Sequence, residues 1–368
     1  MIDRLFSPAF GNRPQIFVGR RDTINDVMSG LKEMPGSKER AVLLLGQRGY
    51  GKTVLLLELA DEASQAGYVV ASPTVVSTGM LNRILEKLSV AAEPYLPRTK
   101  KQLTGGSIGA LGFSASLSFQ GSPTPTPSFA RQLSILCEKL NKKDKGVLIL
   151  IDELVANQEE LRQLIIAYQE MVGEGRNIAI IMAGLPSAVA STLQDHVLTF
   201  LNRAKKINLE PLKTNEIDCY YQEAFAKLGV RVPDDLRKKA SDESQGSPYL
   251  MQLIGHYITL GASQEKAITE KDLLEAVRRA KDDYKNDICQ TSLAPLSEKD
   301  LAFLLAMSQC EGEEIGISSI QEQMHVTSSY VQLYKRRLIQ SGIIEPAGRA
   351  KVRFAIPFLQ EYLLSRSF

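Results

Sequence analysis

The sequence predicts an α/β protein in three parts: a domain built on a parallel sheet, a helical segment, and a C-terminal winged helix-turn-helix domain. Three observations lead to this fold class. A glycine-rich loop at residues 46–53 lies between an apolar run and an amphipathic stretch, and a second apolar run at residues 147–151 ends in two acidic residues. Residues 296–368 then have the pattern of three helices followed by a hairpin. Apolar runs that alternate with amphipathic helices are typical of parallel sheets.

The composition is that of a globular protein with room for more than one core. The chain has 368 residues, of which 44% are hydrophobic and 23% charged, enough for two or three domains. Because the net charge is only +2, any affinity for nucleic acid must come from a local patch. The cysteines, Cys137, Cys219, Cys289 and Cys310, form no C-x-x-C pair, and no apolar run reaches membrane-spanning length. We therefore expect a cytoplasmic protein without disulfides, a zinc site or a membrane span.

The glycine-rich loop has the spacing G-x-x-x-x-G-K-T from Gly46 to Thr53. The preceding run AVLLL predicts a buried strand and the stretch up to Gly67 predicts a helix, which is the context of a phosphate-binding loop. Glycines let backbone N–H groups approach phosphate oxygens at the positive end of the helix. We expect Lys52 to reach the phosphates of ATP and Thr53 to bind Mg²⁺. The candidate nucleotide contacts are Gly46, Gln47, Arg48, Gly49, Tyr50, Gly51, Lys52, Thr53 and Val54.

The second apolar run, Val147–Ile151, predicts a buried strand that is followed directly by Asp152 and Glu153. In a parallel sheet a carboxylate at this end of a strand lies beside the phosphate loop, where Asp152 would hold Mg²⁺ through water. We expect Glu153 to orient and deprotonate the attacking water. By itself an Asp-Glu pair after a strand also suits the polar start of a loop. The phosphate loop upstream favours the catalytic interpretation.

With both motifs present, residues 14 to about 285 resemble the AAA+ ATPases, in the branch shared by the origin-recognition initiators and the STAND signalling ATPases. The resemblance implies a core at residues 1–212 with a five-stranded parallel sheet, and a helical lid at residues 213–287. An F-x-G-R segment implies that Phe17, Val18 and Gly19 line the adenine pocket, and a G-x-P segment implies that Pro248 borders the nucleotide. Both segments also suit an ordinary helix start.

The family's machinery for hydrolysis is only partly matched. Arg203 resembles the arginine finger, which stabilises phosphoryl transfer in cis or across a subunit interface, although it also suits a solvated or salt-bridged arginine. The strand expected at Asn177–Pro186 ends in Ala183 and Gly184, where most of the family carries a polar sensor, and the lid lacks a sensor arginine. We therefore expect slow hydrolysis, typical of an ATP-held switch, and a homo-oligomer if Arg203 acts in trans.

Residues 296–368 have the element order of a winged helix. The stretches LSEKDLAFLLAMSQ, ISSIQEQM and SSYVQLYKRRLIQSG predict three helices, the last one ending at Gly342, and IIEPAGRAKVRFAIP predicts a hairpin with its tip at residues 347–350. Basic residues gather on the third helix and the hairpin: Lys335, Arg336, Arg337, Arg349, Lys351 and Arg353. We expect them to contact double-stranded DNA, with Ser329 and Gln332 as candidates for base edges. The alternatives are a protein-docking surface and a solvated basic face.

An insertion at about residues 100–128 has no assigned role. Its main part, residues 104–129, alternates apolar side chains with Gly and Ser and then repeats Pro and Thr. This pattern predicts a hairpin or extended strand followed by a stiff connector, and it equally suits a mobile surface loop.

Three functions compete for this chain. The preferred hypothesis is an ATP-binding, slowly hydrolysing switch that uses Mg²⁺ and binds DNA in a nucleotide-dependent way. The alternative is a STAND-like signalling or defence ATPase whose winged helix docks a protein partner, although no effector domain or repeat sensor is evident. A small-molecule kinase built on the same loop fits worst, because the Asp-Glu pair and the helical lid suit hydrolysis of a nucleoside triphosphate.

Overall fold

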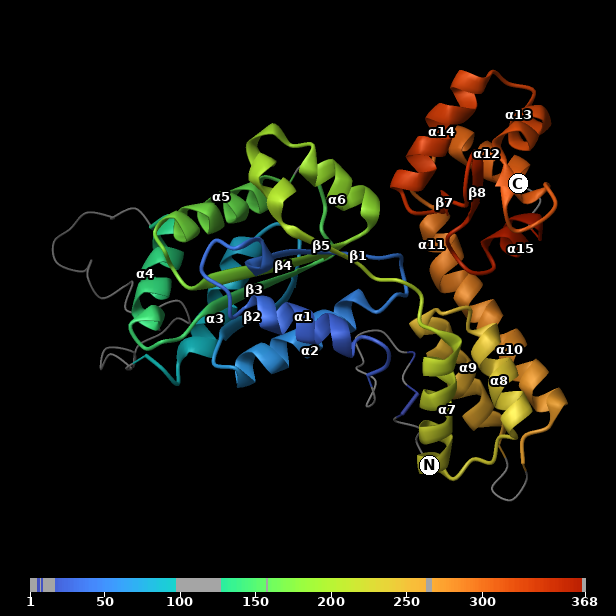
Figure 1. Cartoon of the computed structure of the whole chain (residues 1–368), viewed down its shortest axis with the longest axis horizontal. Helices are drawn as coiled ribbons and strands as arrows, with labels where there is room; N and C mark the ends of the chain where they lie inside the picture. The colour runs from blue at the N-terminus through green and yellow to red at the C-terminus, as the bar shows by residue number, and fades with distance from the viewer. Residues whose placement is uncertain are drawn as a thin grey trace.

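The structure is a computed structural model that describes residues 5–6, 8, 17–96, 127–156, 158–262 and 267–365. Most of the predicted insertion, up to residue 126, lies outside these residues. Figure 1 shows a sheet domain, a helical domain and a C-terminal domain that follow one another along the chain. None of the helices in the described part is long and apolar enough to cross a membrane.

The sheet has five parallel strands, as the sequence predicts. They are β1 (Ala41–Leu45), β2 (Val69–Val75), β3 (Val147–Asp152), β4 (Ile178–Gly184) and β5 (Lys205–Asn208), in the order β2-β3-β4-β1-β5. Every residue of β3 and β4 is buried, because helices cover both faces of the sheet. The order places β4 between the strand that precedes the glycine-rich loop and the strand that ends at Asp152.

Helices cover the two faces of the sheet unequally. One face packs against α1 (Arg21–Gly30) and α2 (Lys52–Gln65), and the short η1 (Lys38–Arg40) precedes β1. The other face packs against α3 (Met80–Ala92), α4 (Phe129–Asn141), α5 (Glu159–Gly173), α6 (Pro186–Leu193) and η3 (His196–Arg203). Alternate strand residues enter the two cores, as in β4, where Ile180 faces one core and Ile181 the other.

The predicted helical segment consists of α7 (Thr214–Leu228), α8 (Asp234–Glu243), α9 (Pro248–Gly261) and α10 (Glu270–Tyr284). Its core includes Phe6, from the start of the chain, whose ring packs on Tyr220, Tyr221 and Phe225 with centroids 5.2–6.0 Å apart. The helical segment therefore depends on residues that precede the sheet domain.

The C-terminal domain has the predicted element order. A short π-helix (η4, Lys285–Cys289) and α11 (Gln290–Leu293) lead to α12 (Glu298–Ser308), α13 (Ile317–Met324), α14 (Ser328–Gln340) and α15 (Leu359–Leu364). Short strands β6 (Ile315–Gly316), β7 (Ile344–Pro346) and β8 (Lys351–Phe354) form an antiparallel sheet in the order β6-β8-β7. Thr327 caps α14, and Gly342, at φ +69°, ends it.

A glycine in α9 tests the packing of Phe6. A Cβ at Gly255 would lie 2.7 Å from Phe6 Cζ and would overlap the ring edge, whereas a Cβ at Gly261 in the same helix would meet nothing within 4 Å. We expect Gly255→Ala to lower the stability by about 2 kcal/mol, because the ring has no room to move aside. Gly261→Ala is the matched control, and equal apparent melting temperatures for the two variants would contradict this packing.

Candidate functional site

The loop between β1 and α2 has the backbone of a phosphate cradle. Gly49 and Gly51 both have φ +78°, a left-handed conformation that favours glycine, and α2 begins directly after Gly51. Gly46 N donates a hydrogen bond to Gly184 O at 3.4 Å, which fixes the loop to the end of β4. The first backbone N–H groups of α2 therefore lie beside the loop, and an anion would bind there.

Lys52 lies inside this loop. Its Nζ donates hydrogen bonds to the carbonyl oxygens of Gly46 and Gln47, each at 2.8 Å. Burial lowers the pKa of Lys52 to about 8, although the nearby carboxylate of Asp152 favours the charged form. Before the ammonium group can contact a phosphate oxygen, it must break its hydrogen bonds to these two carbonyls.

Thr53 and Asp152 meet at the carboxyl edge of the sheet, as predicted. Thr53 Oγ1 donates a hydrogen bond to Asp152 Oδ2 at 2.6 Å, although β4 lies between β3 and β1, the strand that precedes the loop. Asp152 is 5% exposed and its Oδ1 accepts a hydrogen bond from Glu153 N at 2.9 Å. The described residues contain no cluster of three or more His, Cys, Asp or Glu side chains that could hold a metal. A hydroxyl and a carboxylate suit Mg²⁺, which keeps water and phosphate oxygens as its other ligands.

Glu153 has a strained backbone beside Asp152. Its φ of +51° is a conformation that non-glycine residues adopt rarely, and such strain is concentrated at functional sites. The next residue secures the turn, because Leu154 N donates a hydrogen bond to Ala183 O at 2.8 Å. The Glu153 side chain is exposed at the edge of the sheet that carries the loop. This position suits a group that acts on a water molecule beside a bound phosphate.

The end of β4 explains the missing polar sensor. A Cβ at Gly184 would lie 2.9 Å from Leu154 Cβ, so a side chain at this position would displace the residue that follows Glu153. The side chain of Ala183 has no polar group. At the end of β4, between the loop and β3, Gly184 therefore packs against Leu154, and no polar side chain is present.

The helical domain closes over the loop at the start of α9. Tyr249 N donates a hydrogen bond to Gly49 O at 3.3 Å, and a Cβ at Gly51 would lie 4.0 Å from the Pro248 ring. The predicted adenine segment lies between the sheet and the helices, because Phe17 packs on the sheet core and Val18 on the helical core. Gly19, at φ +66°, allows the close approach of Leu212, whose Cδ2 would be 2.6 Å from a Cβ there.

Arg203 lies at the amino ends of the strands, whereas the phosphate loop lies at their carboxyl ends. Lys205 pairs with Val42 near the start of β1, so Arg203 is level with residues before that strand, whereas the loop follows its end. With about 3.3 Å per strand residue, the length of the strand separates Arg203 from the start of the loop by about 20 Å. Arg203 is exposed and has no ion pair within the described ranges. It does not reach the phosphate loop of its own chain.

The predicted DNA contacts have unequal surroundings. Arg337 is paired with Asp300, which is only 2% exposed, at 2.9 Å, and Lys351 is paired with Glu314 at 3.4 Å. Arg353, on the same hairpin, is paired with Glu345 at 2.5 Å. In contrast, the partly exposed Lys335 and the exposed Arg336 and Arg349 have no ion pair among the residues that the structure describes.

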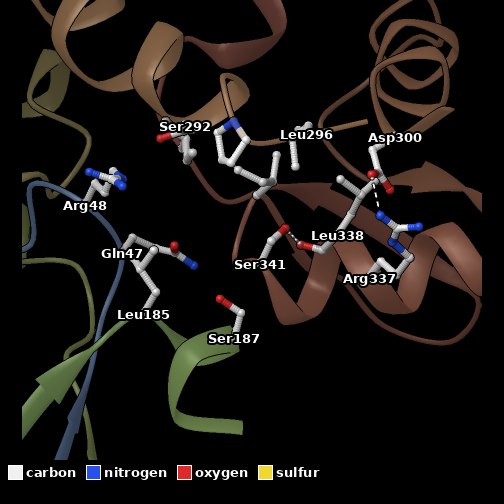
Figure 2. Close-up of a pocket in the computed structure, with 13 residues that line it drawn as sticks. Gln47, Arg48, Leu185, Ser187, Ser292, Leu296, Asp300, Arg337, Leu338 and Ser341 are labelled. Carbon is white, nitrogen blue, oxygen red and sulfur yellow. Dashed lines mark hydrogen bonds and ion pairs between the residues drawn. The ribbon is translucent and has the colours of Figure 1, made fainter. Parts of the chain in front are cut away.

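A cavity of about 310 Å³ between the loop and the C-terminal domain was not predicted from the sequence. Figure 2 shows Gln47, Leu185 and Ser187 on its sheet-domain side, opposite Leu338 and Ser341 of the C-terminal domain. Gly342, which the sequence marks only as the end of a helix, lies against Gln47. No local pattern indicates this junction, because it joins residues about 300 positions apart.

Comparisons with known proteins agree with this geometry. Residues 16–181 match the family model of the AAA ATPase domain, and residues 286–363 match a domain of unknown function (DUF8462). A search among curated proteins found no match.

Among solved structures, the chain resembles a Walker-type ATPase of Pyrococcus abyssi, with a TM-score of 0.69, 16% identity and coverage of 98% of this chain and 99% of that one. It also resembles the ORC2 protein of Aeropyrum pernix in ADPNP–ADP complexes, with a TM-score of 0.65, 15% identity, and coverage of 98% and 96%. A third is Cdc6p from Pyrobaculum aerophilum, with a TM-score of 0.52, 18% identity, and coverage of 99% and 97%. At these identities the likeness establishes a shared fold.

Lys52→Ala removes the charge that the loop encloses. We expect ATP affinity to fall about 30-fold, equivalent to about 2 kcal/mol, because a charge-assisted contact with phosphate is lost. Titration with a fluorescent ATP analogue measures this, with Lys38→Ala as the control for loss of a surface lysine. Unchanged affinity in the Lys52 variant would mean that the nucleotide binds elsewhere.

Glu153→Gln keeps the shape of the side chain but removes its basicity. We expect turnover to fall by about 100-fold or more, while the ATP dissociation constant stays within about twofold. Single-turnover hydrolysis and filter binding of labelled ATP separate these two effects, with Glu159→Gln at the exposed start of α5 as the control. Full turnover in the Glu153 variant would show that another group activates the water.

Proposed function

We propose that this protein, whose residues 16–181 form an AAA ATPase domain, is a nucleotide switch in which Mg-ATP controls how the C-terminal domain binds double-stranded DNA. The observation that carries this proposal is the contact of the phosphate loop with the two domains that follow the sheet. The carbonyl oxygen of Gly49 accepts a hydrogen bond from α9, and the Gln47 side chain packs on the end of α14. A ligand that reshapes this loop therefore acts on both neighbours at once.

In the proposed nucleotide site, each residue of the loop region has a separate role. Lys52 neutralises phosphate charge, Thr53 and Asp152 hold Mg²⁺, and Glu153 activates the attacking water. Mg²⁺ bound there would neutralise charge that develops on the phosphate oxygens. Because β4 ends without a polar side chain at Ala183 and Gly184, the γ-phosphate has one contact fewer than in most of the AAA+ proteins that the sequence resembles. Slow hydrolysis is the expected consequence.

The proposed DNA surface is the outer half of α14, used as the recognition helix of a winged helix. Ser329, Gln332 and Arg336 are exposed there, while the other end of the helix, at Leu338 and Ser341, faces the sheet domain. Recognition helices read base edges with their N-terminal residues, so docking of the C-terminal end leaves the reading surface accessible. Lys335, Arg336 and Arg349 would contact phosphates, whereas Arg337 and Lys351 contribute less, because acidic partners already hold them.

A second candidate function is the docking of a protein partner on the same surface. Leu333 lies on α14 and is 52% exposed, and Glu314 and Glu345 neutralise two cations of the hairpin. An apolar side chain and paired charges at this surface favour a protein partner over a polyanion. The absence of DNA binding together with ATP-dependent association with a protein would favour this alternative.

The proposed oligomer rests on Arg203. This exposed arginine is at the sheet edge away from its own phosphate loop. Charge stabilisation by Arg203 would therefore require the site of a second copy. ATP-dependent self-association that Arg203→Ala leaves intact, with reduced turnover, is the pattern expected for a shared site.

Removal of two unpaired cations tests the DNA surface. We expect Lys335→Ala combined with Arg336→Ala to weaken duplex binding and to reduce the slope of log affinity against log salt by about 2, because two phosphate contacts are lost. Fluorescence anisotropy of a labelled duplex, with Mg-ATP or Mg-ADP at several salt concentrations, measures both quantities. Arg337 is left intact, because its removal would leave the buried charge of Asp300 unpaired.

The matched control is Lys238→Ala combined with Lys271→Ala, which removes from α8 and α10 of the helical domain two exposed charges that have no ion pair among the described residues. Equal DNA affinity in the two double variants would contradict the DNA surface proposed on α14. Affinity that is the same with ATP and ADP would contradict the switch but not the DNA surface.

A further inference from the structure

The side chain of Gln47 brings the phosphate loop into contact with the C-terminal domain. Gln47 lies against Gly342, where a Cβ would be 2.6 Å from Gln47 Nε2 and would overlap the carboxamide oxygen. Figure 2 shows this side chain reaching from the loop toward the end of α14. Gly342 also has φ +69°, so glycine serves there both the backbone turn and the close approach of Gln47.

Two further observations place the C-terminal domain against the loop. Helix α14 packs directly on α6, which follows the end of β4. Burial is the main cause of the raised pKa of Tyr50, about 12, and the charge of Glu345 on β7 contributes to the same shift. The junction therefore extends from Gln47 to Tyr50 along the loop.

The residue that contacts the C-terminal domain also holds the catalytic lysine. The main-chain oxygen of Gln47 accepts a hydrogen bond from Lys52 Nζ at 2.8 Å, and the same oxygen accepts one from Tyr50 N at 3.4 Å. The Gln47 side chain faces Gly342, while its carbonyl faces Lys52. Because both groups belong to Gln47, a movement of its side chain also shifts the carbonyl that binds Lys52.

We infer that Gln47 is a positioning residue through which the docked C-terminal domain holds the phosphate loop in its Lys52-bound geometry and so lowers the affinity for ATP. This inference rests on the nucleotide site of the proposed function, and it is independent of DNA. Lys52 has to leave the carbonyls of Gly46 and Gln47 before it contacts a phosphate. While Gln47 is held against Gly342, the release of Lys52 from these carbonyls disturbs the contact between the loop and the C-terminal domain.

The coupling is reciprocal. If docking of the C-terminal domain weakens ATP binding by a given factor, bound ATP weakens docking by the same factor. The junction is suited to such a movement, because the cavity beside Gln47 leaves it incompletely packed. The contact between Gln47 and Gly342 would thus couple nucleotide binding in the sheet domain to the position of the C-terminal domain.

The test compares substitutions on the two sides of the contact, without DNA. Gly342→Ala, Gln47→Ala and the double variant are titrated with a fluorescent ATP analogue, and KM and kcat are measured in steady state. The control is Gly229→Ala, at the end of α7, because Gly229 also has a left-handed φ of +70° but a Cβ there would meet nothing within 4 Å. It reports the backbone strain alone.

We expect Gly342→Ala to tighten ATP binding about fivefold and to lower KM by the same factor, the lower end of typical coupling between sites. Its kcat should match that of Gly229→Ala, because the groups that act on water are untouched. In the Gln47→Ala background, Gly342→Ala should have no further effect, since the side chain that the added methyl group displaces is gone.

Gly342→Ala with the same ATP affinity as Gly229→Ala would overturn the inference, as would effects of Gln47→Ala and Gly342→Ala that simply add. Failure of the wild-type protein to bind ATP, with no difference from Lys52→Ala, would instead overturn the nucleotide site itself. The two failures are therefore distinguishable.

Discussion

The structure depends on three glycines of the phosphate loop, Gly46, Gly49 and Gly51. Leu209 after β5 lies 3.2 Å from where a Cβ of Gly46 would be, and Tyr249 of α9 lies 3.3 Å from the corresponding position at Gly49. Bare backbone leaves room for phosphate, and it also lets the neighbouring elements approach the loop closely. The same glycines that make a phosphate site thus make the loop the meeting point of the three domains.

The sequence indicates the features that depend on short-range patterns. Strand β1, the loop, the start of α2 and the acidic end of β3 follow from apolar runs and from the spacing of Gly46, Lys52 and Asp152. The order of helices and hairpin in the C-terminal domain follows for the same reason. These features are local, so propensity and periodicity are enough to predict them.

The interactions that assign roles to charged side chains are not local. Arg337 looks like a DNA contact in the sequence, yet the structure pairs it with Asp300, 37 residues away. Lys351 and Glu314 are also 37 residues apart. A composition pattern cannot tell a paired cation from a free one, because pairing depends on how the helices and strands fold against one another. The same holds for Gln47 and Gly342, which only the domain arrangement brings together.

Helix α14 connects the two ends of the proposed switch because it is rigid. Its 13 residues, Ser328–Gln340, span about 20 Å and connect the exposed N-terminal end of the helix to the junction at Gly342. The ion pair between Arg337 and the buried Asp300 fixes the helix to α12, and removal of Arg337 would leave the buried carboxylate without its cation. We therefore expect α14 to shift as a rigid element. In the proposed switch, a displacement of Gln47 would move the outer surface of α14 together with the C-terminal domain, and this would couple the phosphate loop to the proposed DNA surface.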